Sequence, residues 1–224
     1  MHYLTALLLL AMATAGHAQQ RAFTEQGDTI YVFDNGTWSY YPEEPAVNPG
    51  LDVLSEELSI PENGVVRTGD RNKGKRLAGA LGFYELVYDE DFWRRVPPAT
   101  INAEAEYALI GENNGAFMIT LAEEGEIGTE NLLRVARSHM RTVSESPLEL
   151  LEVDRRTVNG VPLIYAAHKV RISGMDIVWM AIYYSGPEGS LQVATWTVAN
   201  VFPKKKAQMQ ALLDNVFIQQ QKRG

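Results

Sequence analysis

The chain has 224 residues, no cysteine, and a formal net charge of −8 from 28 acidic and 20 basic side chains. An acidic protein of this kind is not a general nucleic-acid binder, because phosphate binding needs a basic surface. Without cysteine there are no disulfides, cysteine nucleophiles or thiolate metal sites, so the fold must be held together by its core alone.

The first eighteen residues predict a cleavable signal peptide. An apolar run from Leu4 to Ala15 is interrupted only by threonines, and Gly16-His17-Ala18 supplies the small residues of a signal peptidase site. The run is shorter than the roughly 20 residues needed to cross a bilayer, and no cysteine follows it for lipid attachment. We therefore expect a bacterial protein that is periplasmic or secreted, with no transmembrane segment after cleavage before Gln19.

Residues 19–41 are expected to form a small N-terminal β-hairpin segment. Stretches of β-forming residues at 28–33 and 37–41 flank Asn35-Gly36, a sequence typical of tight hairpin turns. The hairpin carries more aromatic side chains than so small a unit can bury, so it should contact the main domain or a partner. These possible contact residues are Tyr31, Trp38, Tyr40 and Tyr41.

Residues 42–75 are predicted to be linker and loop, because three prolines lie in the nine residues from Pro42 to Gly50 and no periodicity follows over 61–74. The ten residues 67–76, at the boundary with the main domain, hold five cations, which could attract an anionic partner or simply keep the loop solvated. They are Arg67, Arg71, Lys73, Lys75 and Arg76. The segment Gly69–Arg76 nearly matches a phosphate-binding loop but lacks its final hydroxyl, so nucleotide binding is not expected.

Residues 76–218 predict an α+β domain in which an antiparallel β-sheet is flanked by helices, followed by a tail at 219–224. Short turns join the later strands, which favours antiparallel neighbours. Several strands are apolar on both faces, so both faces should be covered, with Trp179 and Trp196 in the core. The expected strands are 83–88, 105–110, 116–121, 148–157, 161–172, 175–184 and 191–199.

Two helices should supply this cover. Thr129 is expected to cap a helix over 130–143, whose apolar stripe is Leu132, Leu133, Ala136, Met140 and Val143, with Arg134, Arg137 and Arg141 on the other side. A C-terminal helix is expected to open at Pro203. Its apolar positions are Met209, Leu212, Leu213, Val216 and Phe217.

This order of elements resembles the PsbP-like α/β/α sandwich over roughly residues 80–218. The local matches are Gly82–Asp89 followed by Phe92-Trp93, and the ending Val201-Phe202-Pro203 with Leu212-Leu213 and Val216-Phe217. The resemblance implies an exported module that binds partners or supports assemblies without catalysis. Functional residues differ between members of this group, so the resemblance assigns none here.

Signals for catalysis or metal binding are weak, and we expect no cofactor and no metal. The mature chain has only His139, expected on a helix rim, and His168, expected in the core or at its edge, without ligand spacing. No Gly-x-Ser-x-Gly motif is present. Asp89-Glu90-Asp91 could offer oxygens to calcium but is typical of a turn. The carboxylates that a hydrolase would need could come from Glu104, Glu106, Glu123, Glu124 or Glu126.

The sequence therefore favours an exported, non-catalytic binding or assembly module of the bacterial cell envelope, with an envelope protein or an anionic envelope polymer as partner. The alternative is a protein that binds a small ligand or an envelope glycan in a pocket between sheet and helices. A carboxylate-based hydrolase of envelope polymers is the third hypothesis.

Overall fold

The computed structural model describes residues 20–23, 29–32, 38–39 and 58–219, in two compact units that divide after Pro49. The first unit contains the antiparallel strands β1 (Gln20–Phe23), β2 (Thr29–Val32) and β3 (Trp38–Ser39), in that order. The pairing of β2 with β3 agrees with the expected hairpin, and β1 adds a strand that the sequence did not predict. The predicted signal peptide lies outside the described residues.

The second unit is built on an eight-stranded sheet with the order β4-β10-β11-β12-β13-β9-β8-β7. All neighbours are antiparallel except β4 and β10, which run parallel. The strands are β4 (Glu62–Arg67), β7 (Trp93–Val96), β8 (Tyr107–Gly111), β9 (Phe117–Glu123), β10 (Glu149–Val158), β11 (Val161–Ile172), β12 (Met175–Gly186) and β13 (Gly189–Val198).

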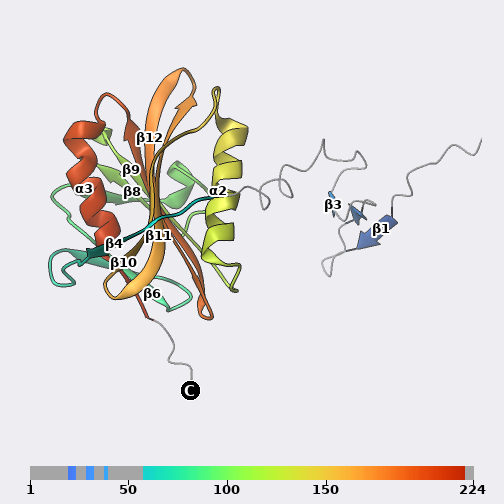
Figure 1. The fold of residues 1–224 in the computed structure, drawn as a ribbon, viewed down its shortest axis with the longest axis horizontal. Helices are drawn as coiled ribbons and strands as arrows, with labels where there is room; N and C mark the ends of the chain where they lie inside the picture. The colour runs from blue at the N-terminus through green and yellow to red at the C-terminus, as the bar shows by residue number, and fades with distance from the viewer. Residues whose placement is uncertain (1–19, 24–28, 33–37, 40–57, 220–224) are drawn as a thin grey trace, which may run out of the picture. The chain divides into compact units, whose positions relative to one another are not determined.

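Helices cover both faces of this sheet. Figure 1 shows the sheet between α2 (Thr129–Val143) and α3 (Phe202–Asp214). Along the chain, the short 3-10 helix η1 (Pro98–Thr100) precedes β8 and the short 3-10 helix η2 (Glu112–Asn114) follows it. This arrangement confirms the predicted α+β class. Over the described ranges, no helix combines the length and the apolar character needed to cross a bilayer.

A second, three-stranded sheet corrects the predicted end of the C-terminal helix. Its order is β14-β6-β5, formed by β5 (Lys75–Ala78), β6 (Tyr84–Tyr88) and β14 (Val216–Ile218). Val216 and Phe217 fit the helical spacing, yet α3 ends at Asp214 and both residues pair with β6 instead. A branched and an aromatic residue suit a strand, and both are buried where they pair with β6.

Strand β4 corrects the expected loop at 61–74. Its residues are mostly exposed on both faces, so they show no alternation of apolar and polar side chains. The strand forms because it pairs in parallel with β10 at the edge of the large sheet. Natural proteins commonly end a sheet with a short, polar strand, because such an edge does not pair readily with another chain.

The face of the sheet under α2 is built on small side chains. Ala166, Ala181 and Ala194 lie directly opposite one another on β11, β12 and β13, and all three are buried. The opposite face carries larger groups, among them Met180 and Ile182, which pack in the core that also holds the buried face of α3. The alanines let α2 pack close to the sheet, since side-chain bulk sets the distance between layers.

The helix α2 differs from expectation at its start and along its buried face. Gly128, with a φ of 86°, precedes the helix, and Thr129 is its first residue rather than its cap. Arg137 was expected to face away from the core, but it is buried with Leu133, Ala136 and Met140. The spacing of these four positions forms one continuous stripe, so position 137 lies in the middle of the face that meets the sheet.

Asn159, in the turn between β10 and β11, joins three segments that are distant in sequence. Its backbone has a φ of 50°, a conformation that asparagine tolerates well. The side-chain Nδ2 donates to the carbonyls of Asp214 and Val216 at 2.8 and 2.7 Å, and Oδ1 accepts the backbone N–H of Gly69 at 2.8 Å. One side chain therefore holds together the β10–β11 turn, the loop before β5 and the junction of α3 with β14.

Replacing this side chain should weaken the fold more than its exposure suggests. We expect Asn159→Ala to lower the free energy of unfolding by about 2–4 kcal/mol, from lost hydrogen bonds and backbone strain. Asn114→Ala is the matched control, because Asn114 has a φ of 51° and no side-chain hydrogen bond to any described residue. Urea denaturation of both variants measures their free energies of unfolding. An equal decrease in the two variants would mean that the three hydrogen bonds of Asn159 do not stabilise the fold.

Buried tyrosines should make the fold sensitive to alkali. Burial raises the pKa of Tyr183 above the ordinary 10.0, against a smaller opposing effect of the Arg137 cation, and burial likewise raises that of Tyr165. The unfolded state releases these protons more readily, so the contribution of these two tyrosines to the free energy of unfolding should be constant below pH 10.0 and fall above it.

The variant Tyr183→Phe isolates one of these groups. The Tyr183 hydroxyl is buried, and its contact with the Trp179 indole N–H falls outside hydrogen-bond geometry, so its removal should leave stability at neutral pH unchanged or higher. The alkaline decline should become shallower in denaturation curves recorded across pH, with Tyr107→Phe as control. An unchanged alkaline slope in Tyr183→Phe would contradict the assignment.

Candidate functional site

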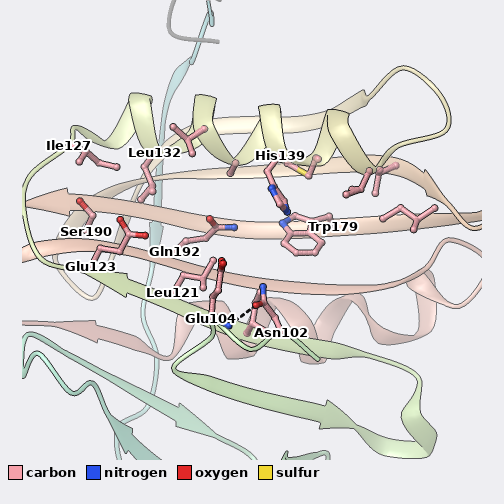
Figure 2. A pocket seen from close by; sticks show the side chains of 17 residues that line it. Asn102, Glu104, Leu121, Glu123, Ile127, Leu132, His139, Trp179, Ser190 and Gln192 are labelled. Carbon is pink, nitrogen blue, oxygen red and sulfur yellow. Dashed lines mark hydrogen bonds between the residues drawn. The ribbon is translucent and has the colours of Figure 1, made fainter. Parts of the chain in front are cut away.

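A groove of about 330 Å³ runs between α2 and the large sheet (Figure 2). Its walls are mainly apolar and come from three places: α2, the strands β9, β11 and β12, and the loop before α2. The apolar lining residues are Ile119, Leu121, Ile127, Leu132, Val135, Ala136, Met140, Val143, Val170, Ile172 and Trp179. Three of these, Ile127, Val135 and Val143, are exposed large hydrophobic side chains that mark its mouth.

The groove exists because α2 covers only part of its face of the sheet. The helix packs chiefly over β11 and β12, and contacts β13 less. Strands β13, β9 and β8 continue beyond the edge of the helix, so Ile119 and Leu121 of β9 form a floor that α2 does not fill. Asn102 and Glu104, in the segment after η1, line the groove as well.

Polar side chains enter this apolar groove from several elements. Figure 2 shows Glu123, Ser190 and Gln192 toward one end, His139 and Trp179 toward the other, and Asn102 with Glu104 on the side away from α2. Gln192 is only 8% exposed, and its side chain forms no hydrogen bond with any described residue. The amide atoms are not fully buried, so they remain accessible from the groove, where they can bond to water or to a ligand.

The charges in the groove have one sign. Glu104 and Glu123 line it, and neither carboxylate forms an ion pair with a described residue. No lysine or arginine is among the lining residues from the described part of the chain. His139, which the sequence placed on a helix rim, is exposed on α2 and is the remaining titratable group of the lining.

A pair of serines holds the loop that closes one end of the groove. The Ser185 hydroxyl accepts the backbone N–H groups of Ile127 and Gly128, both at 3.0 Å, and lies 2.9 Å from the Ser190 hydroxyl. Ser190 in turn donates to the carbonyl of Gly125 at 2.8 Å. This chain of hydrogen bonds fastens the β9–α2 loop to the β12–β13 hairpin and so sets where α2 begins.

Aromatic rings stack across the strands beside the groove. Trp179 and Trp196 are opposite one another on β12 and β13, with ring centroids 4.7 Å apart and an interplanar angle of 10°. Phe117 of β9 continues the row at 5.7 Å from Trp196. Both tryptophans pack against the core under α2, as predicted, but they are half-buried, and Trp179 also forms part of the groove wall.

Under α2, Arg137 meets His168, which is fully buried and so takes the core position among the two expected, core or edge. An Arg137 Nη1 lies 2.6 Å from His168 Nε2, and because a guanidinium can only donate, the histidine nitrogen must accept. Both groups are thus engaged beneath the helix, and neither lines the groove.

The predicted basic cluster lies elsewhere and is partly paired. Arg71 stands 3.7 Å from Glu85 and over the ring of Phe217, Lys75 pairs with Glu90, and Arg76 donates to the carbonyl of Arg71. The hydrogen bond and charge of Glu90 raise the pKa of Lys75. None of the five cations, Arg67, Arg71, Lys73, Lys75 and Arg76, lines the groove.

The side chains of the other predicted contact residues lie outside what the structure describes. Tyr31 and Trp38 are described only as strand positions, and Tyr40 and Tyr41 fall beyond the described ranges. Their role in binding stays a prediction.

The five glutamates that the sequence offered as hydrolase carboxylates lie in different environments. Glu106 accepts the Tyr84 hydroxyl at 2.6 Å and the backbone N–H of Ala80, so it has a structural partner; burial and this contact raise the pKa of Tyr84. Glu124 and Glu126 are exposed in the loop before α2. Only Glu104 and Glu123 share the groove. In the described part of the chain, no three His, Asp or Glu side chains are grouped to hold a metal ion.

The sequence missed this site because its residues carry no motif. They come from β9, β11, β12, β13, α2 and two loops, and are brought together only by strand pairing. The one available signal was Gln192, an amide in a strand whose other polar side chains are small hydroxyls.

No family model matches the chain, and no curated protein matches it by sequence. Solved structures do resemble it. A cyanobacterial PsbP from Synechocystis has a TM-score of 0.51 and 13% identity, covering 64% of this chain and 91% of its own. LpqN of Mycobacterium tuberculosis, described as involved in cell envelope biogenesis, has a TM-score of 0.47 and 13% identity over 79% of this chain and 100% of its own.

The yeast Ran-binding protein Mog1p has a TM-score of 0.47 and 8% identity, covering 65% of this chain and 95% of its own. At such identities the likeness concerns the fold alone. The fold is PsbP-like, which confirms the resemblance drawn from the sequence.

The serine pair can be tested by removing one hydroxyl. Ser185→Ala leaves two loop N–H groups without their acceptor and should lower the free energy of unfolding by about 1–3 kcal/mol. Amide hydrogen exchange at Ile127 and Gly128 should accelerate in the same variant. Ser138→Ala, which removes a hydroxyl from α2 that bonds to no described residue, serves as control. Unchanged exchange in Ser185→Ala would rule out this role of the pair.

Proposed function

We propose that the protein is an exported, non-catalytic binding module of the bacterial cell envelope that holds a small, partly apolar ligand in the groove between α2 and the sheet. The observation that carries this proposal is the groove itself, an apolar channel into which the unpartnered Gln192 side chain points from its floor. Apolar walls with a few well-placed polar groups are typical of small-molecule sites.

The size of the groove supports a small ligand rather than a polymer. Its volume of about 330 Å³ is at the lower end of the roughly 300–1,000 Å³ found for small-molecule sites. Among the two binding hypotheses from the sequence, the geometry therefore favours the ligand binder. The basic loop is the weaker candidate, because Glu85 and Glu90 already pair with two of its cations.

Export is supported by the predicted signal peptide. The non-catalytic assignment is supported by the state of the groove carboxylates. Glu104 and Glu123 are both exposed, and neither contacts a group that would give one the role of acid and the other that of base. The proposal thus assigns these carboxylates to recognition of the ligand.

Blocking the mouth of the groove tests the proposal. The mature protein should bind a neutral apolar probe, N-phenylnaphthylamine, saturably and at one site. Val135→Trp, which places a bulky ring at the mouth, should weaken binding at least about tenfold, equivalent to about 1.4 kcal/mol.

Val66→Trp is the matched control, because Val66 is a strongly exposed valine on β4 that does not line the groove. Its affinity for the probe should equal that of the unmodified protein, as measured by fluorescence titration. Absence of saturable binding, or an equal loss in both variants, would overturn the proposed function.

A further inference from the structure

We infer that the ligand is a cationic amphiphile, with an ammonium group held at the end of the groove formed by Glu123, Ser190 and Gln192 and an apolar body along α2. This inference rests on the proposed function and specifies the chemistry of its ligand. Three independent features of the groove carry it: the sign of its charges, the kind of hydrogen-bonding group at that end, and the position of the apolar walls.

The first feature is charge. Glu123 and Glu104 are the carboxylates of the groove, and neither is neutralised by a described cation. The arginines near the start of α2 are engaged on another side, where Glu130 pairs with Arg134 and Arg155. A cation entering the groove would therefore meet an uncompensated negative potential, and a ligand anion would be repelled.

The second feature is hydrogen bonding. Ser190 donates its proton to the carbonyl of Gly125 and accepts the proton of Ser185, so its oxygen keeps one lone pair that can only accept a bond from a ligand. The Glu123 carboxylate is also an acceptor, and the Gln192 amide can turn its oxygen toward the groove. This end of the groove thus offers acceptors from three side chains, which match the three N–H donors of an ammonium group.

The start of α2 lies near this end and would by itself favour an anion. Its positive potential is already countered by the described residues. The N–H groups of Ile127 and Gly128 donate to Ser185, and Glu130 supplies a carboxylate in the first turn of the helix. The uncompensated charge next to the groove is therefore that of Glu123.

The third feature is the path of the apolar walls. From the acceptor end, Leu121 and Ile119 follow Glu123 at alternate positions on β9, so all three side chains lie on one face of the strand. Leu132 and Val135 line the same groove from α2. An alkyl chain attached to the ammonium group could therefore extend along these walls without leaving a polar group unpaired.

Ligands that share one tail and differ in the head group test the inference. Calorimetric titration of the mature full chain would compare decylammonium, decanol and decanoate, each below its aggregation concentration. We expect decylammonium to bind at least about tenfold more tightly than decanol, with decanoate weakest. In Glu123→Gln, the preference for decylammonium over decanol should fall to about twofold or less, with the affinity for decanol unchanged.

Glu124→Gln is the matched control, because it removes an adjacent exposed carboxylate that does not line the groove. It should keep the full preference for the amine. Equal affinity for the three head groups would overturn the cationic ligand while leaving the proposed function intact. Tighter binding of decanoate would overturn it in favour of an anion at the start of α2. No binding of any of the three, with no binding of the neutral probe, would instead overturn the proposed function.

Discussion

Close packing of α2 against a row of alanines is the contact on which the arrangement of the second unit depends. Ala166, Ala181 and Ala194 are aligned by the register of three antiparallel strands, so one slip of register would replace them with the larger residues of the other face. Small side chains bring the helix close to β11 and β12. The neighbouring strands β13 and β9 remain uncovered beyond its edge, and the groove lies there.

Hydrogen bonds from a few side chains then hold the loops that border this framework. Ser185 and Ser190 fasten the loop before α2, and Asn159 joins the β10–β11 turn to the end of α3. Each of these side chains satisfies backbone groups that regular secondary structure leaves without a partner. Residues that look like ordinary turn residues in the sequence thus position both helices relative to the sheet.

The polar side chains near α2 are of two kinds, one buried and hydrogen-bonded and the other exposed to solvent. Arg137 is buried under the helix with His168 as its acceptor, while Glu104 and Glu123 face the groove without a described partner. A guanidinium in the core must be hydrogen-bonded, because burying a charge without partners is strongly unfavourable. The groove carboxylates keep contact with solvent and need no such partner. This difference leaves the groove carboxylates, and not the buried pair, accessible to solvent.

The sequence by itself determined the α+β class, the central strands, both helices and the PsbP-like order, because these depend on local periodicity and turn residues. Only the tertiary structure decided that Val216 and Phe217 leave the helix, that Glu62–Arg67 forms an edge strand, and that Arg137 faces the sheet. It alone brought Glu104, Glu123 and Gln192 into one groove, because strand pairing between distant segments sets these neighbours and periodicity along one segment carries no information about them.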